Sequence, residues 1–390
     1  MMNRTALFWL PPVLGITLVR SWIYYARMKF NMSRAYILLE IKLPKDTFKS
    51  PAAMEMFLGG INLTSREGNW YAKYWKGSSR PIFSLEMVSI EGAVRFYIRT
   101  EPEFRKLIET QIYAQYPTIE ISEAVDYAMR VPYGKPETDW QLFGTELTLT
   151  KADPYPIKTY VDYGLEGGGA KEEYKIDPIT PVIEYLGSLS KGEQSWIQII
   201  FRGAKLKRVS GGLFGQEKDW KKEGVDIIKD LKAKSYEAKK EGTISGPTKG
   251  EMEAIAAIER SISKNGFECG IRMVYLAKGD AFDKMAISTM TNAFKQFNSN
   301  NLNGFKPVRM TGYDFPWEDF SGKGLARKKA NIFNAYVRRD FFTPPHVGVP
   351  FILNTEELAT VFHFPGQVVQ TPTFERIESR KGEPPTNLPM

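Results

Sequence analysis

The apolar segment TALFWLPPVLGITLVRSWIYYA, residues 5–26, constrains what this chain can fold into more than any other feature. As a helix, its roughly 22 residues would extend about 33 Å, close to the thickness of a bilayer's hydrocarbon core. Arg20 is its only charged residue, and three aromatic residues near its end are typical of the interfacial belt of a membrane helix. The segment predicts a single-pass transmembrane anchor within residues 1–34, with lipid contacts from Phe8, Trp9, Leu14, Ile16, Trp22, Tyr24 and Tyr25.

The charges that flank this segment predict its orientation. Arg4 precedes it, whereas Arg27, Lys29 and Arg34 follow it. Because basic residues favour the cytoplasmic side, the body of the chain is expected in the cytoplasm, beneath the inner membrane. Two other interpretations are a cleaved signal peptide, which lacks a small-residue cleavage site here, and a buried core helix, which a Pro-Pro pair would break.

Residues 35–130 predict the order strand, helix, strand, strand, helix, strand. AYILLEIKLP is the expected first strand, and SPAAMEMFLGGI predicts a helix that starts with proline after a serine cap. IFSLEMVSIEGAVRFYIRT predicts a hairpin, and EPEFRKLIETQIYAQYP predicts an amphipathic helix before the closing strand. This order is the split β-α-β plan of a ferredoxin-like fold, with helices on one face of an antiparallel sheet.

A second, looser copy of this pattern is expected at residues 140–300. TELTLTK and PIKTYVDY are its expected opening strands, and DPITPVIEYLGSL resembles the first helix of the first copy. FECGIRMVYLA, which follows another predicted helix, is the expected closing strand.

Three further segments complete the predicted organisation. A helical insertion at 204–247 interrupts the second copy, a helical and aromatic segment covers 301–369, and a Pro-rich linker tail covers 370–390. The predicted fold is therefore α+β: one N-terminal transmembrane helix, two ferredoxin-like (β-α-β-β-α-β) repeats with antiparallel sheets, and an extended C-terminal tail.

Composition excludes several kinds of site. The net charge of +8 favours an anionic partner, either lipid headgroups or nucleic acid. Cys269 is the single cysteine and there are two histidines, so the sequence has neither an internal disulfide nor a standard zinc set. The glycine-rich GLEGGGAKEE lacks the spacing of a phosphate-binding loop and is interpreted as a flexible loop. The chain is predicted not to be an enzyme and to need no cofactor or metal.

Three segments outside the predicted anchor are candidate contact sites. In GGLFGQ, Leu213 and Phe214 lie between glycines near basic residues and are candidates for contact with the inner leaflet. In GYDFPWEDFSGKG the carboxylates suit acid–base or metal chemistry, but a Pro-Trp turn fixed by aromatic packing is the preferred interpretation. The helix GLARKKANIFNAYVRRD carries basic residues that are either a solvated face or contacts for DNA or an acidic partner. These basic residues are Arg327, Lys328, Lys329, Arg338 and Arg339.

Several segments carry a resemblance to a known family. They include LLEIKLPKDTFKSPAAMEMFL, SLEMVSIEGAVRFYIRT, KIDPITPVIEYLGSLSKGEQSWIQI and, most specifically, the closing stretch 355–389. These segments resemble an uncharacterised bacterial membrane-protein family, the region N-terminal to the ATPase domain of type IV secretion and conjugation coupling proteins (TraG/TraD- and HerA-like). The resemblance implies that the tail leads to a P-loop ATPase. That ATPase is fused in relatives, whereas this sequence reaches Met390 without one.

The predicted function is a membrane-anchored cytoplasmic scaffold for a type IV secretion-like or conjugative DNA-transfer ATPase, without catalysis of its own. The expected partners are the inner membrane, a P-loop ATPase in trans or fused, DNA, and a second copy of the chain. An autonomous membrane-tethered nucleic-acid-binding protein is the first alternative. An exported hydrolase with an unrecognised site is the second, and a cleaved N-terminus would favour it.

Overall fold

The computed structural model describes residues 6–44, 49–65, 67–134, 138–166, 176–205, 207–210, 216–240, 248–313 and 315–365, and every structural statement below concerns these residues. The predicted contact loop with Leu213 and Phe214 and the predicted tail at 370–390 lie outside the described residues. The side chain of Phe8 lies outside them too.

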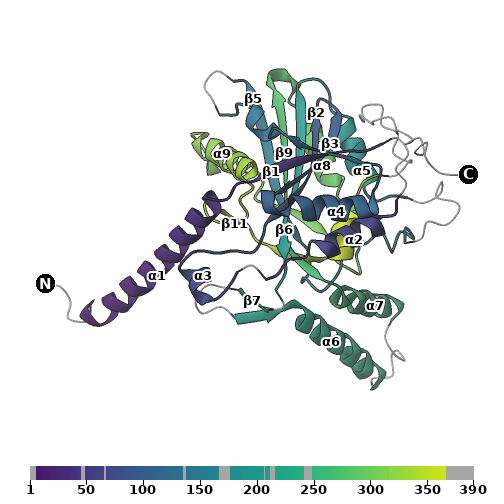
Figure 1. Cartoon of the computed structure of the whole chain (residues 1–390). Helices are drawn as coiled ribbons and strands as arrows, with labels where there is room; N and C mark the ends of the chain where they lie inside the picture. The colour runs from purple at the N-terminus through teal and green to yellow at the C-terminus, as the bar shows by residue number, and fades with distance from the viewer. Residues whose placement is uncertain are drawn as a thin grey trace, which may run out of the picture.

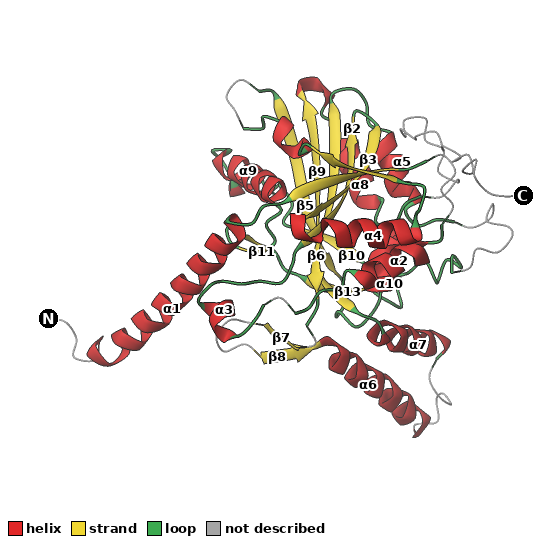
Figure 2. Cartoon of the chain, in the orientation of Figure 1, coloured by secondary structure: helices red, strands yellow, loops and turns green. Residues whose placement is uncertain are grey.

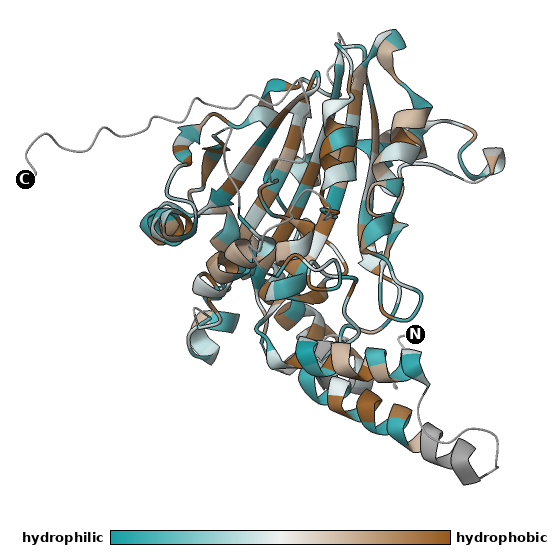
Figure 3. Ribbon diagram, turned by 90° about the vertical axis from the view of Figure 1, so that its right-hand side faces the viewer, coloured by the Kyte–Doolittle hydropathy of each residue, from teal (hydrophilic) through white to brown (hydrophobic). Residues whose placement is uncertain are grey.

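One antiparallel sheet of nine strands forms the centre of the fold (Figures 1 and 2). Its strands follow the order β10-β5-β9-β6-β2-β3-β1-β4 in space, and β13 pairs with the first residues of β9. Apolar residues recur along these strands (Figure 3). The strands of this sheet are β1 (Ile37–Lys42), β2 (Phe83–Ile90), β3 (Ala93–Thr100), β4 (Glu120–Ala124), β5 (Trp140–Leu149), β6 (Glu193–Gly203), β9 (Gly266–Lys278), β10 (Phe305–Val308) and β13 (Phe351–Asn354), and two small hairpins are β7 (Lys207–Ser210) with β8 (Gln216–Asp219) and β11 (Phe342–Thr343) with β12 (His346–Val347).

Helices cover both faces of the sheet. One face carries α2, α4, α5, α8 and α10, whose apolar side chains form the main core together with the strands. The other face is covered by α9, where Ile332, Phe333 and Tyr336 pack against Trp196 and Val274. α6 and α7 pack on each other beside the sheet (Figure 1). The helices are α2 (Pro51–Gly60), α3 (Trp70–Tyr74), α4 (Arg105–Gln115), α5 (Thr180–Gly187), α6 (Trp220–Lys240), α7 (Lys249–Ser263), α8 (Lys284–Asn292), α9 (Lys323–Arg338) and α10 (Thr355–Val361), preceded by the N-terminal α1 (Ala6–Met32).

β2 and β6 join two halves of the sheet. The first half has the spatial order β4-β1-β3-β2 and the second half the order β10-β5-β9-β6. β2 and β6, each the second strand of its half along the chain, therefore lie at the junction. The two strands pair continuously from Phe83 with Phe201 to Ile90 with Gln194. Each of these two strands is paired on both sides and covered on both faces, so both are buried along nearly their whole length.

The predicted architecture is wrong in how the sheet is built. Two ferredoxin-like repeats with antiparallel sheets are expected from the sequence, whereas the α+β structure joins both halves in one large antiparallel sheet of nine strands. FECGIRMVYLA forms most of β9, which pairs with β5 on one side and β6 on the other and is therefore a central strand instead of a closing strand. PIKTYVDY forms loop and turns instead of a strand.

The N-terminal helix also differs from its prediction. None of the helices in the described part of the chain combines the length and the hydropathy that a bilayer span requires. The apolar run of α1 is interrupted by Arg20, by the prolines at positions 11 and 12 and by several Trp and Tyr side chains. This finding contradicts the predicted single-pass transmembrane anchor of residues 1–34 and gives no support to the single-pass inner-membrane localisation that depends on it.

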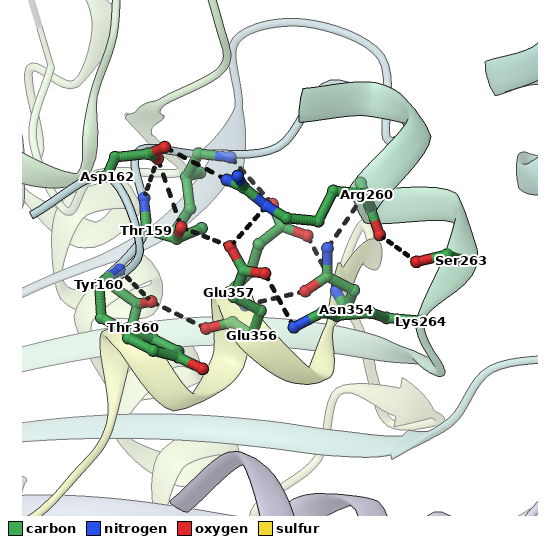
Figure 4. A network of polar contacts seen from close by, with 12 residues as sticks. Thr159, Tyr160, Asp162, Arg260, Ser263, Lys264, Asn354, Glu356, Glu357 and Thr360 are labelled. Atoms are coloured by element: carbon green, nitrogen blue, oxygen red, sulfur yellow. Dashed lines mark hydrogen bonds and ion pairs between the residues drawn. The ribbon is translucent and has the colours of Figure 1, made fainter. Parts of the chain in front are cut away.

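A buried polar network holds α10 in place (Figure 4). Glu356 pairs with Arg260 at 3.2 Å and with Lys264 at 2.8 Å, both near the end of α7. Glu357 accepts two backbone N–H groups, one of them from Ile157 at 2.9 Å. Burial raises the pKa of Glu357 to about 8. Because both Glu357 oxygens accept backbone hydrogen bonds, we interpret this carboxyl group as structural.

A row of polar residues crosses the sheet on the face that α9 covers. It takes one residue from each strand between β4 and β5, at positions paired directly across the ladders. The centre of the row is buried, so each polar group there must find a partner inside the protein. The row consists of Ser122, Glu40, Tyr97, Glu86, Gln198, Arg272 and Glu146.

Two arginines neutralise the buried carboxylates of this row. Arg339, which directly follows α9, donates to both carboxylate oxygens of Glu86 at 3.0 Å. Burial alone would raise the pKa of Glu86, but the charge and hydrogen bonds of Arg339 outweigh it and lower the pKa to about 2. Arg272 donates to Glu146 at 2.8 Å and to the amide oxygen of Gln198 at 3.3 Å. The row is therefore ionised and internally paired at its centre.

We expect Arg339→Ala to destabilise the fold by about 3–5 kcal/mol, because it leaves Glu86 charged and buried without its main partner. Arg338→Ala is the matched control. Its side chain is exposed and pairs with Asp340 at 2.6 Å near the surface, so its loss should change stability by less than about 1 kcal/mol. Denaturant unfolding followed by circular dichroism measures both, and equal losses would contradict the role given to Arg339.

We expect Glu86→Gln to be less stable than the unaltered chain at neutral pH, by an amount that shrinks in acid. The pKa of Glu86 is lower in the folded state than its ordinary value of 4.5, so its stabilisation is complete above about pH 4.5 and is lost as pH falls toward about 2. Unfolding free energies measured across this range test the prediction. Glu123→Gln, at an exposed ion pair, is the control and should be about as stable as the unaltered chain at every pH. A loss of stability in Glu86→Gln that does not depend on pH would contradict the link between the pKa of Glu86 and stability.

Candidate membrane interface

Side-chain contacts fix the C-terminal end of α1 to the body of the protein. Asn31 donates to the hydroxyl of Thr343 in the β11–β12 hairpin at 2.5 Å. Arg34, just beyond the helix, pairs with Glu101 at 2.9 Å, and both side chains are almost fully buried. The rest of α1 projects away from the sheet (Figure 1).

A glycine lets the chain after α3 reach the backbone of α1. Gly77 has a φ of +72°, a conformation that favours glycine, and a Cβ at this position would collide with the carbonyl of Ala26. Ala26 is buried at this contact. The close approach places α3 directly beside α1.

α3 is too short to bury a face of its own. Asn69 caps it by accepting the N–H of Ala72 at 3.0 Å, and none of its residues is buried. The preceding segment is anchored through Glu67, which pairs with Arg80 at 2.9 Å and with Lys205 at 2.5 Å. Burial would raise the pKa of Glu67, but these basic partners outweigh it and lower the pKa. The body therefore holds α3 in place with its aromatic residues outward.

Aromatic side chains of α1 and α3 form one exposed cluster. The rings of Trp22 and Trp75 lie 4.8 Å apart, and Trp75 stacks on Tyr71 at 6.4 Å. Trp70 and Trp75 expose 72% and 55% of their surface. We call this cluster the aromatic surface, and it consists of Trp22, Tyr25, Trp70, Tyr71, Tyr74 and Trp75.

Lysines accompany these rings. The ammonium groups of Lys29, Lys73 and Lys76 lie 6.0, 5.2 and 5.7 Å from the centres of aromatic rings in the cluster. A large exposed aromatic area with a basic rim is typical of a surface that contacts an interface between water and lipid.

The anchor residues predicted from the sequence lie on α1, and those with described side chains are exposed. Two of them, Trp22 and Tyr25, belong to the aromatic surface. The others are Trp9, Leu14, Ile16 and Tyr24. Sequence reasoning missed α3, although the residues WYAKYWK after an asparagine cap are a readable signal of a short aromatic helix.

The structure separates the basic residues predicted to bind DNA or an acidic partner. Arg327, Lys328 and Arg338 are exposed on α9. Lys329 is half-buried, and burial lowers its pKa. Arg339 lies in the core, paired with Glu86, and is not available to an external phosphate.

No metal centre is evident in the described part of the chain, where no group of three or more His, Cys, Asp or Glu side chains could hold an ion. Cys269 is buried in β9, and burial raises the pKa of its thiol. His363 is buried between the carbonyl of Ala359 and the carboxylate of Asp177. Both side chains therefore have structural surroundings.

We expect Gly77→Ala to loosen α1 from the body, because the new methyl group collides with the backbone at Ala26. Amide hydrogen exchange in the last turns of α1 should accelerate at least about tenfold, which corresponds to a loss of about 1.4 kcal/mol in the free energy of local opening. Gly134→Ala is the matched control, because Gly134 has a similar φ of +81° but open space around it. Unchanged exchange in α1 for both variants would contradict the contact.

The comparisons with known proteins add one finding. A family model for a domain of unknown function, DUF8128, matches residues 29–376. A search of curated proteins finds no match. The matched region begins in the last turn of α1 and includes α3, the whole sheet and α10.

Proposed function

This chain belongs to the DUF8128 family, and we propose that it is a non-catalytic scaffold that docks on an anionic membrane through its aromatic surface. The observation that carries the proposal is the exposed contact between Trp22 of α1 and Trp75, which directly follows α3, with lysines at its rim. Docking of this kind takes place at the lipid headgroups and requires no helix that crosses the bilayer.

Energetics support a lipid partner for this surface. Tryptophan and tyrosine favour the headgroup region, because their rings leave water while their polar atoms stay hydrated. Each lysine near an anionic leaflet adds about 1 kcal/mol of attraction, and the net charge of +8 acts in the same direction. The cytoplasmic leaflet, which carries the anionic lipids, is the proposed location.

The scaffold role also depends on a partner that the sequence resemblance implies. A P-loop secretion or conjugation ATPase remains the predicted partner, in trans or fused to relatives, and oligomerisation with it remains a prediction. A membrane surface and a tether would together raise the local concentration of such an ATPase. Recovery of a P-loop ATPase with the chain from solubilised membranes would support this role, and its consistent absence would count against it.

We expect Trp70→Ala combined with Tyr74→Ala to weaken binding of the full chain to vesicles that contain anionic lipid by about tenfold, because two exposed rings lose their contact with the interface. Flotation with vesicles measures the partition. Met252→Ala combined with Met285→Ala is the control, because it removes exposed apolar side chains from α7 and α8, away from the aromatic surface. Equal binding by both double variants, or no binding by the unaltered chain, would contradict the proposal.

A further inference from the structure

A second group of exposed aromatic residues lies in the loop that leads into α9. Phe315, Trp317 and Phe320 expose 51%, 62% and 89% of their surfaces, and we call these three residues the aromatic ledge. The rings of Phe315 and Trp317 stack almost in parallel, 4.7 Å apart with 9° between their planes. Leaving rings of this size in water is unfavourable, so the ledge is a candidate contact surface.

Polar contacts hold the loop and leave the rings outside. Asp319 accepts the N–H of Leu325 at 2.6 Å, and this and further backbone hydrogen bonds lower its pKa. Lys328 donates to the carbonyl of Gly312 at 3.1 Å and lies 3.5 Å from the centre of the Tyr313 ring. The loop is therefore built against α9, and its exposed rings are part of a defined conformation.

The direction of α9 places the ledge on the outside of the protein. The C-terminal end of α9 leads to Arg339, which is buried against Glu86 in the sheet, whereas Phe320 and Lys323 at the opposite end are exposed. In Figure 1, α9 lies on the same side of the sheet as α1 and α3. Lys323 and Arg327 are exposed near the outer end of α9 and supply positive charge next to the ledge.

We infer that the aromatic ledge is a second membrane contact, which inserts its rings into the headgroup region of an anionic bilayer. This inference rests on the proposed docking of the aromatic surface. Two contacts on one side of the body would fix its orientation on the membrane, which a single contact does not. A nucleic-acid strand fits the ledge less well, because its phosphates would lie next to Glu318 and Asp319, whereas a bilayer takes up the rings and leaves those carboxylates in water.

The test uses Trp317 as a probe in the full chain, bound to vesicles of phosphatidylglycerol and phosphatidylcholine that contain brominated lipid. Bromine quenches tryptophans that enter the bilayer. We expect Trp317→Phe to lower the quenched fraction of the fluorescence, because it removes a quenched ring. Trp140→Phe is the control. Trp140 lies at the start of β5, outside both proposed membrane contacts, so its removal takes away an unquenched ring and should raise the quenched fraction of the fluorescence.

A second measurement gives the strength of the contact. Trp317→Ala combined with Phe320→Ala should weaken vesicle binding about tenfold. Vesicle binding by the unaltered chain without quenching of Trp317 would overturn the ledge contact and leave the aromatic surface standing. No vesicle binding at all would overturn both. Quenching of Trp317 by an oligothymidylate, with none by brominated lipid, would assign the ledge to single-stranded nucleic acid instead.

Discussion

The buried ion pair between Glu86 and Arg339 is the interaction on which the rest of this structure depends. Glu86 lies on β2, directly opposite Gln198 on β6, at the junction of the two halves of the sheet. Gln198 donates to the carboxylate of Glu86 at 3.0 Å, so a side chain of the second half binds directly to a side chain of the first half. A register shift of one residue would move Glu86 to the opposite, apolar face, away from both partners. The polar row therefore specifies how the halves pair, which apolar contacts alone specify less strictly.

Local patterns in the sequence predict most of the helices and strands, because capping and periodicity act within a few residues. α2 begins at Pro51 after the Ser50 cap, as predicted, and the helix predicted in GLARKKANIFNAYVRRD is α9. The joining of the halves through β2 and β6 could not be predicted in this way. Strand edges pair through backbone groups that every residue carries. The sequence of a strand whose edge is paired with another strand can therefore resemble that of a strand whose edge is free.

The candidate site shows the same limit at the level of single residues. Arg338 and Arg339 are chemically identical neighbours, yet one is exposed and the other is sealed against Glu86, because the helix ends between them. The apolar character of α1 suggested lipid contact, and its length suggested a span. The length argument failed because a spanning helix also needs a high mean hydropathy, which Arg20, the prolines and the Trp and Tyr residues of α1 lower.

The contacts at the base of α1 have a mechanical consequence for a docked scaffold. Asn31 of α1 binds Thr343 in the β11–β12 hairpin, and His346 of the same hairpin lies 2.7 Å from Glu146 in the polar row. Glu146 in turn binds Arg272 in the middle of the sheet. α1 is therefore connected to the core through short polar contacts instead of a flexible linker. A load applied to the body, for example by the proposed motor, would reach the aromatic surface without first extending a tether, so the body and its proposed membrane contacts should move as one unit.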